Sequence, residues 1–224
     1  MTILELFEKH LSTVEEDLDD EILGALIRDN EDVLNDDVSE NVEAIYFKDV
    51  GFSIIKKIVE DENYPITSTY FIRVEGDIDL SKTNLLSAYF EEIRYVDKII
   101  FTASVRSAIL KDVHIREIII DKNIDFLYSL SLEECIIENL SIDNQEELLE
   151  LHLFQNKIKN FDVDEVTING MDTFDSSGNS FIGDAEGDVE VLRRYFLTKH
   201  HLNNKSDRRG EASISDTGLF DFKN

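Results

Sequence analysis

The chain contains few residues whose type and spacing could support catalysis. It has no G-x-S-x-G nucleophile motif, no glycine-rich phosphate-binding loop, no C-x-x-C and no H-E-x-x-H. His114 and His152 alternate with apolar residues, so both should face outward about 10 Å apart, too far to share one metal ion. The adjacent His200 and His201 would point in different directions on a helix. The histidine spacing therefore predicts no metal site.

The carboxylates and the cysteine give no specific catalytic signal either. Pairs such as Glu133 with Glu134 are uninformative in a chain with 49 acidic residues. The single cysteine, Cys135, cannot form an internal disulfide and occupies an apolar position, which favours a buried, unreactive thiol. We therefore expect a protein that is not an enzyme and that needs no metal or other cofactor.

The net charge indicates what kind of partner the chain would bind. With 22 basic and 49 acidic residues, the formal charge is −27. This argues against direct binding to nucleic acid or to an anionic membrane, because both require a basic surface. It favours a protein partner with a basic surface. No apolar run approaches a membrane span, and Glu5 and Glu8 lie where a signal peptide would be basic and then apolar, so we expect a cytoplasmic protein.

The charge is distributed unevenly and defines two candidate partner-binding segments. Residues 1–40 hold 14 acidic and 2 basic side chains. The acids that we assign to a partner-binding surface are Glu15, Glu16, Asp17, Asp19, Asp20 and Glu21. The basic segment, residues 193–209, provides a second set, which is Arg193, Arg194, Lys199, Arg208 and Arg209. Either segment could instead be a solvated helix face, so both assignments are hypotheses.

The spacing of apolar residues predicts the elements that position these side chains. Within residues 1–40, apolar residues recur three and four apart, which predicts an acidic helical region with Thr2 and Glu5 as a capping box. From Ala44 to Ile55 the apolar and aromatic residues indicate a strand, and residues 61–66 a loop. Residues 172–188 are rich in turn-forming residues, and a capping helix with a tail is expected over 189–224.

Residues 41–188 are dominated by a repeat of about 21 residues. One marker is a short apolar pair, which recurs as Ile78/Leu80, Ile99/Phe101, Ile118/Ile120, Leu140/Ile142 and Phe161/Val163. A second marker keeps the same step and comprises Phe90, Leu110, Leu132 and Leu153. One such coil cannot bury its own apolar face, whereas stacked coils form a continuous core. The repeat therefore predicts a solenoid.

The best-preserved coils resemble short bacterial leucine-rich repeats. Leu127 to Leu140 and Leu148 to Phe161 match L-x-x-L-x-L-x-x-N/C-x-I-x-x-L at every position, and the resemblance covers residues 78–163. It implies a buried side-chain ladder in which Asn156 takes part and Cys135 is the usual substitute. Val113 and Ile93 cannot take that role, so the ladder would be interrupted in the earlier coils.

A second family is also similar. Leu132, Ile137 and Ile142 lie five residues apart, as do the equivalent residues of neighbouring coils, and this step resembles pentapeptide-type right-handed β-helices. The two families differ in cross-section, which is an open horseshoe in one and a closed coil in the other. We predict a mainly β protein, a right-handed parallel β-solenoid of either kind, with an N-terminal helical cap and a C-terminal helix.

Three functions follow as hypotheses. The first is a non-enzymatic protein–protein interaction module, an acidic inhibitor or immunity-type protein that occupies a basic, nucleic-acid-binding site on its partner, as DNA-mimicking pentapeptide β-helix proteins do. The second is a scaffold or accessory subunit of a larger assembly. The third is a small carbohydrate-active β-helix enzyme, which would require exposed aromatic platforms around a carboxylate pair. The sequence leaves the partner and the oligomeric state open.

Overall fold

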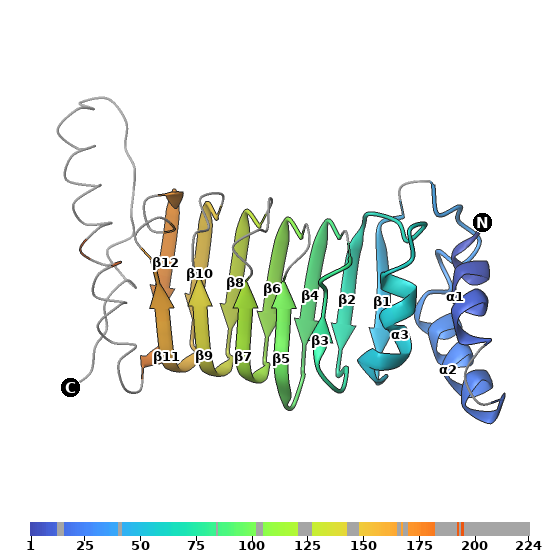
Figure 1. The fold of residues 1–224 in the computed structure, drawn as a ribbon, viewed down its shortest axis with the longest axis horizontal. Helices are drawn as coiled ribbons and strands as arrows, with labels where there is room; N and C mark the ends of the chain where they lie inside the picture. Colours follow the sequence, from blue (N-terminus) through green and yellow to red (C-terminus); the bar gives the residue numbers. More distant parts are fainter. Residues whose placement is uncertain are drawn as a thin grey trace.

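Two parallel β-sheets face each other along the length of the molecule (Figure 1). The computed structural model describes residues 1–12, 16–39, 42–83, 85–101, 105–120, 127–142, 148–164, 167, 170–181, 192 and 194. The seven-stranded sheet has the order β1-β2-β4-β6-β8-β10-β12, and the six-stranded sheet has the order β13-β11-β9-β7-β5-β3. The chain alternates between the sheets, which makes a β-solenoid of about six turns. The predicted fold class is confirmed, and its handedness stays a prediction.

Equivalent strands pair in register from one coil to the next. The seven-stranded sheet comprises β1 (Ala44–Lys48), β2 (Ser68–Ile72), β4 (Ser87–Glu91), β6 (Ser107–Lys111), β8 (Ser129–Glu133), β10 (Glu150–Phe154) and β12 (Thr173–Ser177). The six-stranded sheet comprises β3 (Ile78–Asp79), β5 (Val96–Phe101), β7 (His114–Ile120), β9 (Ile136–Ile142), β11 (Lys157–Val163) and β13 (Ser180–Phe181). The in-register pairing aligns equivalent side chains in straight rows along the solenoid.

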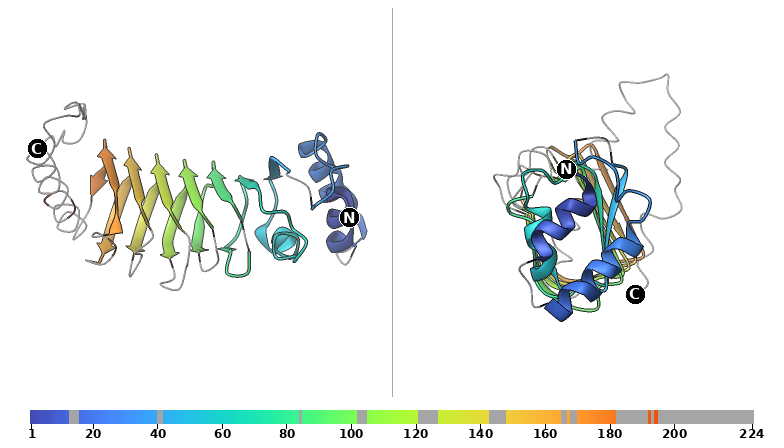
Figure 2. Two further views of the ribbon diagram at one scale, coloured as in Figure 1. Left: turned by 90° about the horizontal axis from the view of Figure 1, so that it is seen from above. Right: turned by 90° about the vertical axis from the view of Figure 1, so that its right-hand side faces the viewer.

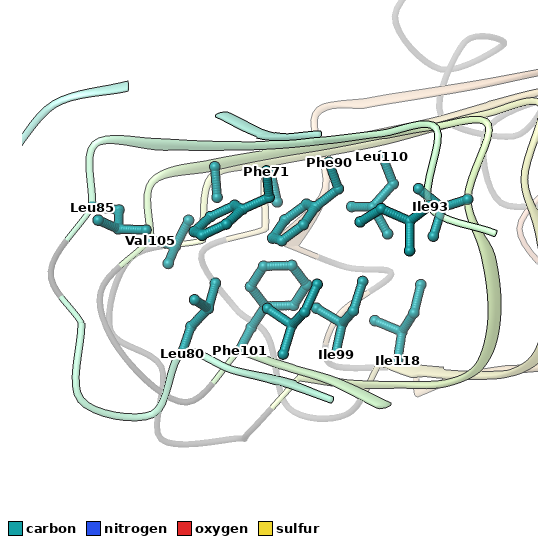
Figure 3. Close-up of a cluster of buried hydrophobic side chains, with 14 of the residues drawn as sticks. Phe71, Leu80, Leu85, Phe90, Ile93, Ile99, Phe101, Val105, Leu110 and Ile118 are labelled. Carbon is teal, nitrogen blue, oxygen red and sulfur yellow. The ribbon is translucent and has the colours of Figure 1, made fainter. Parts of the chain in front are cut away.

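The two apolar markers of the repeat form the core between the sheets. Phe71 and Phe90 of the seven-stranded sheet lie opposite Ile99 and Phe101 of the six-stranded sheet (Figure 3). The Phe71 and Phe90 rings stack with centroids 5.1 Å apart, and the Phe101 ring meets Phe90 edge-on at 5.9 Å. All four side chains are buried. Because strands enclose this core on two sides, the cross-section is a closed, flattened coil, as the view along the axis in Figure 2 shows.

Two helices lie at the β1 end of the stack, α1 (Ile3–Leu11) and α2 (Glu16–Asp29) (Figure 1). The predicted capping box is confirmed, because Thr2 and Glu5 each accept a hydrogen bond from the other's backbone N–H. Phe7 of α1 packs against Phe47 of β1 with ring centroids 6.2 Å apart. Asn30 donates to the Tyr46 carbonyl at 2.9 Å and accepts from the Tyr46 N–H at 2.8 Å. These bonds satisfy backbone groups that an unpaired edge strand would leave free.

The strand predicted from Ala44 to Ile55 is wrong beyond Lys48, where β1 ends. A third helix, α3, begins at Phe52 and covers Phe52–Val59. Phe52, Ile55 and Val59 are all buried and recur three and four residues apart, so helical periodicity overrides the β-branched composition. The Phe52 N–H donates to the Glu75 carbonyl at 2.8 Å, and Lys56 of the helix donates to Asp79 of β3 at 2.7 Å, so the helix lies beside β3.

The C-terminal predictions are tested only in part. The turn-rich composition of residues 172–188 concealed β12 and β13, which continue both sheets. Leu192, helical and buried, and Arg194, helical and exposed, fall within the predicted capping helix. The other residues of that helix and the tail lie outside the described residues. No helix in the described part of the chain has the length and apolar character needed to cross a membrane.

Candidate functional site

A row of mostly charged side chains lines the turn that connects the two sheets. The residue after each strand of the seven-stranded sheet has a φ of 51–66°, and these seven residues, here called the turn row, are Asp49, Arg73, Glu92, Asp112, Glu134, Gln155 and Gly178. Every member is exposed. A positive φ costs a residue with a Cβ about 1–2 kcal/mol. Gly178 shows that glycine fits the position, so six coils retain a side chain at some cost in stability.

The backbone of the turn row is held by bonds between coils. The Glu134 N–H donates to the Phe154 carbonyl of the next coil at 2.9 Å, and the Asp112 N–H donates to the Glu133 carbonyl at 3.0 Å. These bonds point the amides along the solenoid and leave the side chains in solvent. The turn row is therefore a rigid array, with neighbouring members about one strand spacing, roughly 4.8 Å, apart.

Ion pairs neutralise only one end of the turn row. Arg73 donates to Asp49 at 2.8 Å and to Glu92 at 2.7 Å, and its guanidinium lowers the pKa of Asp49. Among the described residues, no basic group lies within ion-pair distance of Asp112 or Glu134. The middle of the row therefore keeps most of its negative charge.

The strand ends next to the turn row enlarge this negative surface. Over three consecutive coils, the last strand residue and the turn residue make an acidic patch, which comprises Glu91, Glu92, Lys111, Asp112, Glu133 and Glu134. Five carboxylates and one ammonium give these six residues a net charge of −4, and Arg73 of the preceding coil pairs with Glu92 at its edge. A shallow hollow of about 220 Å³ adjoins it, and Arg94 and His114 contribute to the lining.

An uncharged strip lies on the outer face of the same sheet. Its residues are the partly exposed first and third positions of β1, β2, β4, β6 and β8, which are Ala44, Tyr46, Ser68, Tyr70, Ser87, Tyr89, Ser107, Ile109, Ser129 and Ser131. The strip ends at β10, where Glu150 and His152 occupy the equivalent positions. His152 Nδ1 lies 3.1 Å from an oxygen of Asp175, so charge resumes in the last two coils.

The three tyrosines of the strip form a stacked ladder. The rings of Tyr46 and Tyr70 have centroids 4.6 Å apart, and those of Tyr70 and Tyr89 are 4.3 Å apart with only 7° between their planes. Burial and the neighbouring phenols raise the pKa of Tyr70, which keeps its hydroxyl neutral. Because the ring faces cover one another, the ladder presents ring edges and hydroxyls to solvent.

The outer face of the six-stranded sheet has a different character. Arg116 of β7 donates to Asp97 of β5 at 2.8 Å, and Lys98 lies 3.5 Å from Glu117. Exposed Lys159 of β11 continues the row of charged side chains. Opposite charges alternate along this face and pair with one another, so it lacks both the excess charge of the acidic patch and the neutrality of the strip.

The buried polar residues serve the fold. Asn156 accepts from the Cys135 N–H at 2.9 Å and donates to the Leu132 carbonyl at 2.8 Å, as the predicted ladder requires. The ladder continues at Asn179, which the sequence analysis missed because the last coil has 23 residues and a turn-rich composition. Asn179 accepts from the side chain of Asn156 at 2.9 Å and donates to the Leu153 carbonyl at 2.7 Å.

The acids and bases predicted to bind a partner are only partly described. Asp20 and Glu21 are exposed on α2. Glu16, Asp17 and Asp19 belong to α2, but their side chains lie outside the described part, as does Glu15 entirely. Of the basic set, Arg194 alone is described; Arg193, Lys199, Arg208 and Arg209 fall outside. These assignments stay predictions.

The histidine predictions are partly wrong. His114 and His152 both face outward, but they belong to β7 and β10 on opposite sheets rather than to one surface. Within the described ranges, no group of three or more His, Cys, Asp or Glu side chains could hold a metal ion.

The sequence analysis also missed the turn row and the neutral strip, although a signal for both was present. The segments S-A-Y-F-E-E at 87–92, S-A-I-L-K-D at 107–112 and S-L-S-L-E-E at 129–134 share one pattern. In it, a serine and a second uncharged residue alternate with buried apolar residues, and charged residues follow. Aligning the coils by this segment would have placed both surfaces.

Comparisons with known proteins add no relative. No protein-family model matches the chain, and neither the curated proteins nor the solved structures contain a significant match. The two family resemblances therefore remain resemblances. The fold and surfaces define the class: a two-sheet parallel β-solenoid with an acidic turn edge and an uncharged strip on the outer face of one sheet.

Proposed function

We propose that this protein is a binding module whose acidic surface occupies a basic, nucleic-acid-binding site on a partner protein, as an inhibitor or immunity-type protein does. The acidic patch carries the proposal, because it presents exposed carboxylates on a rigid backbone at the regular spacing of the coils. A basic site built for the phosphates of a nucleic acid offers the complementary charge. A cytoplasmic setting stays part of this proposal.

The charge density of the solenoid supports the comparison with nucleic acid. Residues 42–181 carry 27 acidic and 13 basic side chains, a net charge of −14. Seven strands at about 4.8 Å spacing span about 29 Å, so the solenoid carries about one net charge per 2 Å, against one per about 1.7 Å in duplex DNA. A partner that neutralises phosphates would therefore meet a similar linear charge density here.

The other two hypotheses receive less support from the geometry. A sugar-binding enzyme would offer aromatic ring faces to its substrate, whereas the stacked tyrosine ladder covers its own faces. An accessory subunit held by the basic C-terminal segment depends on residues outside the described part of the chain. We therefore retain the acidic binding module as the function.

A pull-down at low salt tests this proposal. The full chain is immobilised, exposed to native lysate and eluted with a salt gradient, and the eluted proteins are identified by mass spectrometry. Affinity is then measured with the purified partner over a range of salt concentrations. The test variant E92Q/D112N/E134Q neutralises the acidic patch. The control variant E31Q/E62Q/D162N removes the same charge from exposed acids elsewhere.

We expect the patch variant to weaken binding about 3- to 150-fold at low salt, if three exposed pairs contribute ~0.2–1 kcal/mol each. Its affinity should also depend less on salt. The control variant should stay close to the wild type. Equal losses in both variants, or binding that salt does not change, would refute the role of the patch. A third variant that neutralises the six predicted acids of residues 15–21 measures their contribution separately.

A further inference from the structure

The uncharged strip is exceptional for this protein. In a chain of which 32% is charged, ten partly exposed residues in five adjacent strands include no charged side chain. In β1, β4, β6 and β8 the outward charges are confined to the fifth position, which holds Lys48, Glu91, Lys111 and Glu133. The long strands of the other sheet carry charge within the strand, for example Asp97 on β5, Arg116 on β7 and Lys159 on β11. The neutral strip is thus a local property of the seven-stranded sheet.

The composition and order of the strip match the core of a protein-binding surface. Interface cores are depleted in charged residues and in serine and enriched in tyrosine, so the tyrosines and the missing charge match such a core, whereas the five serines match the composition of antibody paratopes. Tyrosine provides a large amphipathic contact area at a small entropic cost, and serine adds adaptable hydrogen bonds. Here Tyr70 is already held between Tyr46 and Tyr89 at centroid distances of 4.6 and 4.3 Å, so little rotamer freedom remains to be lost on binding.

The strip and the acidic patch adjoin on the same strands. In β4 the strip residues are Ser87 and Tyr89, and Glu91 and Glu92 of the patch follow directly. The strip covers the first three residues of five strands, about 24 by 10 Å, or about 240 Å² in projection. This is below the roughly 800 Å² that each partner buries in a stable interface. The strip alone therefore offers too little contact area for a stable complex, and the adjoining acidic patch provides additional area.

We propose that the neutral strip and the acidic patch form one docking face, with the strip as its core and the patch as its charged rim. The partner is a protein with a flat, uncharged surface bordered on one side by lysines or arginines. This inference rests on the proposed function for the basic border and adds the neutral core. A second copy of the chain is a poor occupant, because each copy carries a net charge of −27 and the basic residues beside its strip, Lys48, Arg106 and Lys111 among those described, do not form a continuous border.

Site-specific cross-linking tests where the partner lies. The photoreactive residue p-benzoylphenylalanine is placed at Tyr70 or at Ser107 within the strip, and at exposed Asn160 on the six-stranded sheet as a control. The probe is native lysate at low salt, and the cross-linked peptides are mapped by mass spectrometry. We expect one protein to cross-link from positions 70 and 107 but not from 160, through an uncharged segment close to lysines or arginines. Equal cross-linking from position 160, a mapped acidic segment, or a second copy of this chain would overturn the inference.

Charged substitutions separate this inference from the proposed function. S107D places a charge within the strip, on β6, and N160D places one on the control face. S107D should lower the affinity for the cross-linked partner at least 10-fold and leave the salt dependence of binding unchanged. N160D should leave the affinity close to that of the wild type. Poly-L-lysine serves as a purely basic probe, and S107D should leave its binding unchanged.

Failure of the docking core and failure of the acidic binding module then give different results. If S107D binds the partner normally while E92Q/D112N/E134Q loses it, the docking core is refuted and the acidic module stands. If S107D loses the partner while E92Q/D112N/E134Q keeps both its affinity and its salt dependence, the acidic module is refuted and the strip stands as a binding surface. Circular dichroism of each variant confirms that the solenoid is folded.

Discussion

Replacing Asn156 by alanine should strongly destabilise the solenoid without touching either proposed binding surface. Asn156 is 1% exposed. Its side chain accepts from the Cys135 N–H at 2.9 Å, donates to the Leu132 carbonyl at 2.8 Å and donates to the Asn179 side chain at 2.9 Å. The first two partners belong to the preceding coil and the third to the following one, so one amide group connects three coils.

The expected cost follows from the groups that lose their partner. In N156A, the Cys135 N–H and the Leu132 carbonyl lose the hydrogen bonds that Asn156 gives them in the interior. A buried polar group left unsatisfied costs about 1–3 kcal/mol, so two such groups predict a loss of about 2–6 kcal/mol. The Asn179 oxygen keeps the Asn156 backbone N–H as a donor at 2.9 Å and adds little to this sum.

Asn160 provides a matched control in the same coil. It donates to Asn139 at 2.7 Å across the outer face of the six-stranded sheet, and this bond is exposed to solvent. Because water replaces a lost partner at an exposed site, N160A should change the free energy of unfolding by no more than about 0.5 kcal/mol. The two variants thus remove the same chemical group from buried and exposed positions.

Urea unfolding followed by circular dichroism measures both variants, and hydrogen exchange reports the Cys135 amide directly. N156A should lower the midpoint of unfolding and accelerate exchange at Cys135. Solenoids can lose stability locally, so the exchange measurement keeps the prediction testable if unfolding is not two-state. The reasoning is refuted if N156A lies within 0.5 kcal/mol of the wild type, or if N160A is equally destabilising.

Three further outcomes are expected. E134G should raise the free energy of unfolding by up to about 1 kcal/mol in urea because it relieves a positive φ, whereas E138G in strand β9 should lower it. Burial opposes ionisation of Asp61, but hydrogen bonds from Lys9, Asn63 and His10 outweigh it and hold the pKa of its carboxyl well below the usual value near 4. The stabilisation from ionised Asp61 is complete above the pKa of Asp61 in the unfolded chain and is lost as the pH falls through its lower pKa in the folded protein. In D61N, the free energy of unfolding should therefore fall less steeply as the solution is acidified. Burial raises the pKa of the Cys135 thiol to about 12, so an Ellman assay should detect it only after unfolding; a rapid reaction in the native protein would contradict its burial.

The repeat itself could be recognised because solenoid coils are local. Markers such as Phe90 and Leu110 lie about one coil apart in sequence and face the same core, so their spacing predicts the stack directly. The prediction failed at Phe52 to Ile55, where a helix replaces the second strand of the first coil. Isoleucine and phenylalanine suit both structures, and the tertiary contacts of α3 with α1 and with Asp79 of β3 accompany the helix.

The candidate surfaces required the register of the strands. Glu92, Asp112 and Glu134 are about 20 residues apart in the chain, and the short segments that contain them become a signal only when the coils are aligned with one another. Pairing of β4 with β6 and of β6 with β8 brings them into one row and turns Tyr46, Tyr70 and Tyr89 into a stack. Each coil contributes only a few residues to these surfaces, so the pairing between coils is needed to assemble them.

By itself, the sequence determined the period of the coils, the inward residues, the capping box of α1 and the net charge, because each depends on residue type or on spacing within one coil. The tertiary structure alone decided the closed cross-section, the extension of the buried ladder to Asn179 and the separation of the outer surface into neutral, acidic and charge-paired faces. The physical reason is that these features arise between coils. Hydrogen bonds across parallel strands align residues about 20 positions apart, and only that alignment determines which side chains become neighbours.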